Sequence, residues 1–138
     1  MRLVALSYLF VALGGALGAM ARYGLNVALQ RDFEFPFGTL TANLVGCLVM
    51  GVIAQFVASS EWFNASGVIP DQYRLLFAVG FCGAFTTLSA LVFEINVLMQ
   101  RDELLLAFSY LVVTMIGGFA CFYVGVVATR AMLAGGAA

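Results

Sequence analysis

The sequence predicts an all-α membrane protein, and three observations lead to that fold class. Of the 138 residues, 64% are hydrophobic and 9% are charged, whereas a soluble domain carries about one quarter charged residues. Four apolar stretches are each long enough for a helix to cross a bilayer, which takes about 20 residues. The charged residues are concentrated in the short segments between these stretches. A single domain of four transmembrane helices, residues 1–138, follows.

The four predicted spans are residues 3–29, 38–58, 75–99 and 104–132. The first begins like a signal peptide, with Arg2 before an apolar core, but its apolar pattern continues to Leu29, so we interpret it as a retained membrane helix. Pro36 and the sequence "QRDE" from Gln100 mark two of the breaks. The third break is the loop 59–74, whose Trp62 is typical of a membrane interface, and the sequence indicates no further role for this loop.

The third span carries an unusual sequence, "GFCGAFTTLSALVFE", from Gly80 to Glu94. Glycines and the β-branched pair Thr86 and Thr87 fall near its middle, where they lower helix propensity. Irregular backbone at that depth is tolerated only where it is buried in protein or lines a cavity. We therefore predict that the third helix is broken near its middle.

The arginines are shared equally between the two sides of the predicted bundle, which then has no preferred orientation. They are Arg2, Arg74 and Arg130 on the side of the termini, and Arg22, Arg31 and Arg101 towards the other. This balance predicts dual topology with antiparallel dimers, although a chance tie explains it too. The glycine faces of the spans offer close contacts for a dimer, while the GxxxG of Gly14 and Gly18 can equally act within one chain.

Ionisable and polar residues inside the spans are candidates for function, because they are costly in lipid. Arg22, Asn43, Glu94 and Tyr110 are all predicted to lie in the same half of the bilayer. Arg22 has two interpretations. It can pair with Glu94 in a salt bridge that fixes the fold, or it can supply the positive charge of a vestibule that attracts anions.

Hydroxyl and amide groups extend this polar cluster. Tyr110 and Thr114 are four residues apart and share one helix face, and Asn43 and Ser89 add further donors. Such a set can replace the water shell of a small anion. The alternative is that the hydroxyls bond back to carbonyls of their own helix. If an inverted second copy crossed at the third-span break, converging carbonyls would form a site for a hard cation such as sodium.

Several function classes are disfavoured by composition. The chain has no histidine, and its three cysteines lack metal-ligand spacing, so neither a catalytic arrangement nor a metal cluster is indicated. A net charge of -1 without basic clusters offers nothing to nucleic acid. The sequence thus indicates neither an enzyme nor a nucleic-acid-binding protein.

The motifs "GGALGAMARY", "PFGTLTANLVG" and "GFCGAFTTLS", in this order, resemble those of the Fluc family of fluoride channels, also called CrcB. The resemblance implies a bacterial inner-membrane channel that exports fluoride passively. It also implies an antiparallel homodimer with two pores and a central structural sodium ion. By the same resemblance, the carbonyls of Gly83 and Thr86 hold the sodium and Asn43 donates to fluoride. The vestibule and polar-track positions are Arg22, Ser89, Tyr110 and Thr114.

The chain departs from the family pattern where the pore is lined. The family's usual TFSTF reads "TLSAL" here, so Leu88 and Leu91 replace two phenylalanines, and Gly118 stands where serine is common. Three explanations stay open: another lining conducts fluoride, the chain is one subunit of a heteromer with a paired homologue, or the path carries another cargo or nothing. A rival class is a small four-span proton-coupled exporter, but those proteins carry a glutamate in span one, where this chain has Arg22. A subunit without a pore is a further alternative.

Overall fold

The computed structural model describes residues 2–29, 35–59 and 70–135, all of them helical apart from short connections. The first, second and last spans are single helices: α1 (Arg2–Leu29), α2 (Phe37–Ala58) and α7 (Leu104–Gly135). The third span is divided into α4 (Pro70–Tyr73), the π-helix η1 (Arg74–Cys82), α5 (Gly83–Phe85) and α6 (Leu88–Gln100). All four spans are long and apolar enough to cross a membrane, which confirms the predicted all-α fold of a multi-pass membrane protein.

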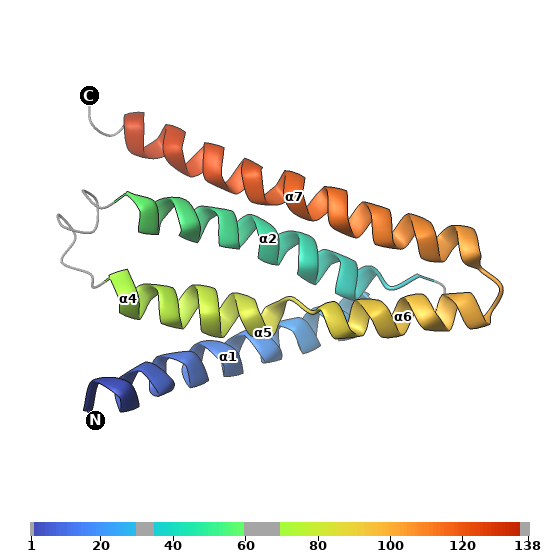
Figure 1. Cartoon of the computed structure of the whole chain (residues 1–138), viewed down its shortest axis with the longest axis horizontal. Helices are drawn as coiled ribbons and strands as arrows, with labels where there is room; N and C mark the ends of the chain where they lie inside the picture. Colours follow the sequence, from blue (N-terminus) through green and yellow to red (C-terminus); the bar gives the residue numbers. More distant parts are fainter. Residues whose placement is uncertain (1, 30–34, 60–69, 136–138) are drawn as a thin grey trace.

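The four spans lie side by side along the long axis of the molecule (Figure 1). Helix α1 begins and α7 ends at the same end of the bundle, as an even number of spans requires. The most extensive contacts join α2 to α7 and α1 to η1, and smaller ones join α1 to α2 and α6 to α7. The bundle is therefore built from two closely packed helix pairs.

Glycines allow the helices of each pair to approach backbone to backbone. A Cβ atom at Gly14 or Gly18 of α1 would overlap a carbonyl oxygen of η1, and one at Gly51 of α2 would overlap a carbonyl oxygen of α7. A Cβ atom at Gly125 of α7 would likewise overlap a carbonyl oxygen of α2. These glycines therefore serve packing within one chain, which is the alternative raised from the sequence for Gly14 and Gly18.

The π-helical geometry of η1 was not predicted from the sequence. Its wider turns lie against the glycine face of α1, with the carbonyl groups of Leu76 and Phe81 nearest to Gly14 and Gly18. A π-helix is rare and marks places where a helix accommodates an irregular contact or a functional site. Here it leads directly into the broken part of the third span.

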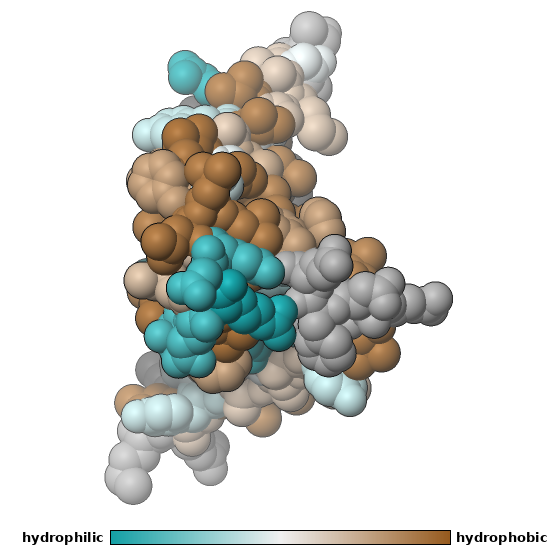
Figure 2. Space-filling model, turned by 90° about the vertical axis from the view of Figure 1, so that its right-hand side faces the viewer, coloured by the Kyte–Doolittle hydropathy of each residue, from teal (hydrophilic) through white to brown (hydrophobic). Residues whose placement is uncertain are grey.

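The turn between α6 and α7 ends the bundle opposite the termini. Asp102 adopts a φ of 60°, a left-handed conformation that aspartate tolerates better than most residues, and the amides of Asp102 and Glu103 cap the end of α6. Figure 2 looks onto this end, where hydrophilic residues gather while hydrophobic residues cover the surroundings. Residues 100–103 are all exposed, as expected for a turn at the membrane surface.

The glycine packing gives a first prediction. In Gly18→Ala, the added methyl group meets the Phe81 carbonyl, and overpacking of this kind costs about 1–3 kcal/mol. Gly24→Ala on the same helix meets nothing within 4 Å and is the matched control, since both changes raise helix propensity equally. We expect a lower thermal midpoint in detergent for Gly18→Ala alone, and equal midpoints for the two variants would contradict the packing.

Candidate functional site

The predicted break in the third span is present at Thr86 and Thr87. Both residues have extended backbone, with φ, ψ of -83°, 155° and -153°, 122°, and helix α6 restarts at Leu88. The Thr86 hydroxyl donates to the Cys82 carbonyl at 2.8 Å, which closes the end of α5. The Thr87 hydroxyl accepts from the amide of Ala90 at 3.3 Å and so caps the start of α6. The two threonine hydroxyls therefore supply hydrogen-bond partners to the end of α5 and to the start of α6.

Asn43 of α2 binds the backbone of the break at two points. Its Nδ2 donates to the Thr87 carbonyl at 3.2 Å, and its Oδ1 accepts from the Thr87 amide at 2.8 Å. Asn43 is 8% exposed, so both bonds are shielded within the chain. The second N–H of Nδ2 has no acceptor among the described residues.

Gly46 makes room for this contact. It lies one turn after Asn43 on α2, and a Cβ atom there would overlap the methyl group of Thr86. Asn43 and Gly46 of this motif therefore both seat the break of the third span against α2.

A second polar cluster joins three helices around Glu94 of α6. Thr39 of α2 donates to Glu94 Oε1, and Tyr110 of α7 donates to Oε2, both at 2.7 Å. Tyr110 and Thr39 are fully buried, whereas Glu94 itself is half-buried. Hydrogen bonds to a charged acceptor are stronger than neutral ones, so Glu94 ties together α2, α6 and α7.

Arg22 does not take part in this cluster. In the described part of the chain, no ion pair joins it to Glu94, whose two carboxylate oxygens are bonded by hydroxyl groups instead. The interpretation of Arg22 as the salt-bridge partner of Glu94 is therefore wrong in this structure. Arg22 lies half-buried on α1, and its role as a vestibule charge stays a prediction.

The hydroxyls predicted to line a polar path are bonded within the chain. Thr114 Oγ1 donates to the Tyr110 carbonyl one turn earlier at 2.7 Å, which is the back-bonding alternative raised from the sequence. Ser89 Oγ lies 3.2 Å from Thr87 Oγ1, at an exposed position. The roles of these residues in an ion path stay predictions.

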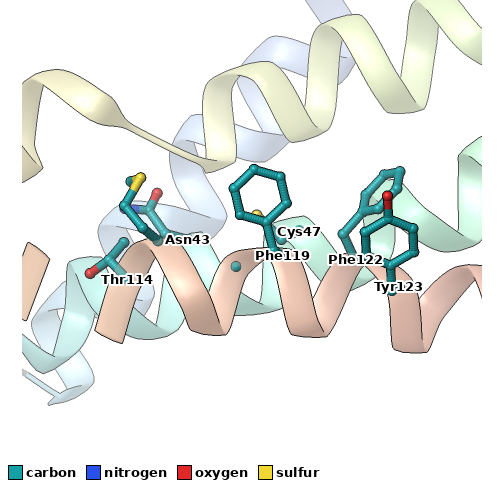
Figure 3. A pocket seen from close by; sticks show the side chains of 8 residues that line it. Asn43, Cys47, Thr114, Phe119, Phe122 and Tyr123 are labelled. Carbon is teal, nitrogen blue, oxygen red and sulfur yellow. The ribbon is translucent and has the colours of Figure 1, made fainter. Parts of the chain in front are cut away.

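A pocket of about 360 Å³ lies between α2 and α7, next to Asn43. It has room for several water molecules. Figure 3 shows Phe119 projecting from α7 between Asn43 and the pair of Phe122 and Tyr123. The lining residues are Asn43, Cys47, Thr114, Met115, Gly118, Phe119, Phe122 and Tyr123. The pocket thus combines the amide of Asn43 and the hydroxyl groups of Thr114 and Tyr123 with three aromatic rings.

The two leucines that replace the family's phenylalanines lie in different surroundings. Leu91 is 1% exposed and packs in the core with Leu40, Leu98 and Tyr110. Leu88 is 68% exposed at the start of α6. Neither of them lines the pocket. Trp62 and most of the loop 59–74 lie outside the described residues, as does Arg31.

Sequence reasoning placed Asn43, Glu94 and Tyr110 in one region, and the structure joins Glu94 to Tyr110 and, separately, Asn43 to the break. It missed Thr39, which binds Glu94, and the backbone of Thr87, which binds Asn43. Thr39 had a signal, because it stands four residues before Asn43 and so shares its helix face. The Thr87 backbone had none, since backbone partners carry no sequence signature.

A family model described as "CrcB-like protein, Camphor Resistance (CrcB)" matches residues 9–126, which is most of the chain. The chain belongs to the CrcB family. The match includes all four spans, and with them Asn43, the third-span break and Glu94.

Curated relatives of this CrcB chain are named "Fluoride-specific ion channel FluC". The protein from Prosthecochloris aestuarii is 39% identical over 88% of this chain and 91% of the relative. The protein from Chlorobium phaeobacteroides strain BS1 is 42% identical over 85% and 88%. The protein from Francisella philomiragia is 40% identical over 78% and 82%. The name that these relatives carry describes ion channels and not enzymes.

The contact between Asn43 and Thr87 gives a second prediction. Asn43→Leu keeps the volume but leaves the Thr87 N–H and carbonyl without partners, at a cost of about 1–3 kcal/mol for each group. We expect faster hydrogen exchange at the Thr87 amide and a lower thermal midpoint. Asn96→Leu, at an exposed position on α6, is the control. Unchanged exchange at Thr87 would show that Asn43 does not hold the break.

Proposed function

We propose that this chain forms a passive, fluoride-selective ion channel in the bacterial inner membrane. The observation that carries the proposal is the pocket between the apolar helices α2 and α7, which is lined by Asn43, whose Nδ2 group has a second N–H beyond the one that it donates to Thr87. The name of the curated relatives supplies the ion. Such a channel lets fluoride leave the cytoplasm, where it is trapped after HF crosses the membrane and dissociates.

We propose an antiparallel dimer with two pores as the conducting assembly. The balanced arginines favour insertion in both orientations. Most of the apolar surface of each span also lies uncovered in the single chain. In α7, for example, 17% of the most apolar stretch of 18 residues is buried within the chain. A second copy covering part of this surface would close the open side of the pocket, with lipid covering the rest.

A structural sodium ion at the centre of this dimer is part of the same proposal. In a continuous helix, the Gly83 carbonyl would accept from the Thr87 amide, but that amide donates to Asn43. The Thr86 carbonyl would accept from the Ala90 amide, which is bonded to the Thr87 hydroxyl instead. Two carbonyl oxygens next to the break are therefore free of their helical partners, and main-chain carbonyls suit a hard cation.

The channel proposal predicts fluoride efflux from liposomes that contain this chain alone. A fluoride electrode would record release from fluoride-loaded vesicles, with chloride-loaded vesicles as the selectivity control. We expect fast efflux of fluoride and none of chloride. No efflux from protein shown to be folded and dimeric would contradict a homodimeric fluoride channel and favour a heteromer or another cargo.

The sodium proposal predicts ion-specific stabilisation. A ligand at 100 times its dissociation constant stabilises the folded state by about 2.7 kcal/mol, so the thermal midpoint should rise with sodium concentration. Potassium at equal ionic strength is the control. The efflux rate should also fall when sodium is replaced by potassium on both sides of the vesicles. Equal midpoints and rates in the two salts would overturn the sodium site without affecting fluoride conduction.

A further inference from the structure

The threonine hydroxyl that lines the pocket beside Asn43 is a poor candidate for binding an anion in this structure, because its proton is already engaged. Thr114 donates to the Tyr110 carbonyl, and the Tyr110 hydroxyl next to it donates to Glu94. An anion needs positive ends of dipoles, and the oxygen atoms of these two groups present lone pairs. Asn43 has a second N–H beyond the one that it donates to Thr87, and the Tyr123 hydroxyl lies at the other end of the row of side chains in Figure 3.

Aromatic rings supply the positive dipole ends that the Thr114 and Tyr110 hydroxyls do not. The hydrogen-bearing edge of a phenylalanine ring is positive, whereas its face is negative. Phe119 and Tyr123 are one turn apart on α7 and therefore share a helix face, and they are 68% and 62% exposed in the isolated chain. Phe122 packs edge-on against Tyr123, with ring centroids 5.6 Å apart and an interplanar angle of 87°. The pocket therefore has an aromatic wall on α7.

Phe119 is the ring of this wall that lies nearest to Asn43 along the pocket in Figure 3. Its ring projects from α7 in front of Cys47, which stands one turn after Asn43 on α2. No residue of the third span lines the pocket, and Leu88 and Leu91 lie outside it. All of the aromatic rings that line the pocket belong to α7.

We propose that Phe119 provides the aromatic edge along which fluoride passes in this chain, next to the Asn43 amide. Phe119 thus supplies from α7 the ring that Leu88 and Leu91 cannot supply from the third span. The proposal rests on the proposed fluoride channel. It makes Phe119 a residue that determines anion selectivity, not a side chain that only faces lipid. The pocket volume also allows the anion to keep part of its water shell while one side is covered by the ring.

The test compares three single variants with the wild-type chain in fluoride-loaded liposomes. Phe119→Leu removes the ring and keeps an apolar side chain, and Phe119→Tyr keeps the ring. Phe108→Leu is the matched control, because Phe108 is 65% exposed on the same helix but does not line the pocket. We expect Phe119→Leu to lower the fluoride efflux rate by roughly two- to tenfold, the range of measured aromatic contacts, while Phe108→Leu retains the wild-type rate and Phe119→Tyr, which keeps the ring, loses less than Phe119→Leu.

A second measurement separates a pore effect from a folding effect. All variants are compared by size-exclusion profile and thermal midpoint. Slower efflux from Phe119→Leu with an unchanged profile and midpoint supports an aromatic edge in the path, and a slower efflux that follows an equal loss of folded protein contradicts it.

The possible failures are distinguishable. If the wild-type chain conducts and Phe119→Leu conducts equally well, the role of Phe119 is overturned and the fluoride channel stands. If Phe119→Leu and Phe108→Leu lose efflux equally, the loss is not specific to the pocket and the role is likewise overturned. If the folded wild-type chain does not conduct fluoride at all, the proposed function fails, and with it this inference.

Discussion

The two hydrogen bonds between the Asn43 side chain and the Thr87 backbone are the interaction on which the rest of the structure depends. Lipid offers no partner to an interrupted helix, so a break at mid-span is stable only if protein groups satisfy it. The Asn43 side-chain amide meets this need, because it donates one hydrogen bond to the Thr87 carbonyl and accepts another from the Thr87 N–H. Because the Thr87 amide is held by Asn43, it is withdrawn from Gly83, and the break becomes a fixed feature of the fold.

The ionisable groups predicted to share one half of the bilayer are bonded in different ways. Glu94 receives the hydroxyl protons of Thr39 and Tyr110, so its two oxygens are held in a network of hydrogen bonds between three helices. Arg22 has no carboxylate partner in the described part of the chain. If Arg22 acts as the proposed vestibule charge, its positive field would favour anions over cations in its surroundings.

The sequence was informative where a single physical constraint decides the outcome. Span length fixes the four helices, and the threonine pair at 86 and 87 marks the break, because β-branched residues prefer extended backbone. It was uninformative where a residue has several possible partners. Gly14 and Gly18 suit any close helix contact, and only the three-dimensional packing assigns them to η1 rather than to a second copy. The pairing of Glu94 with hydroxyls instead of Arg22 has the same cause.

The leucines at 88 and 91 are not equivalent departures from the family pattern. Leu91 is enclosed by Leu40, Leu98 and Tyr110, so a larger ring there would have to displace a core that also holds the Tyr110 hydroxyl against Glu94. Leu88 is exposed and has no such restriction. A change of side chain at position 91 therefore affects the hydrogen bonds around Glu94 through the packing of the core. A change at the exposed position 88 has no such effect within one chain. Compensation from α7 is consistent with this asymmetry, since Phe119 reaches the pocket without disturbing the core.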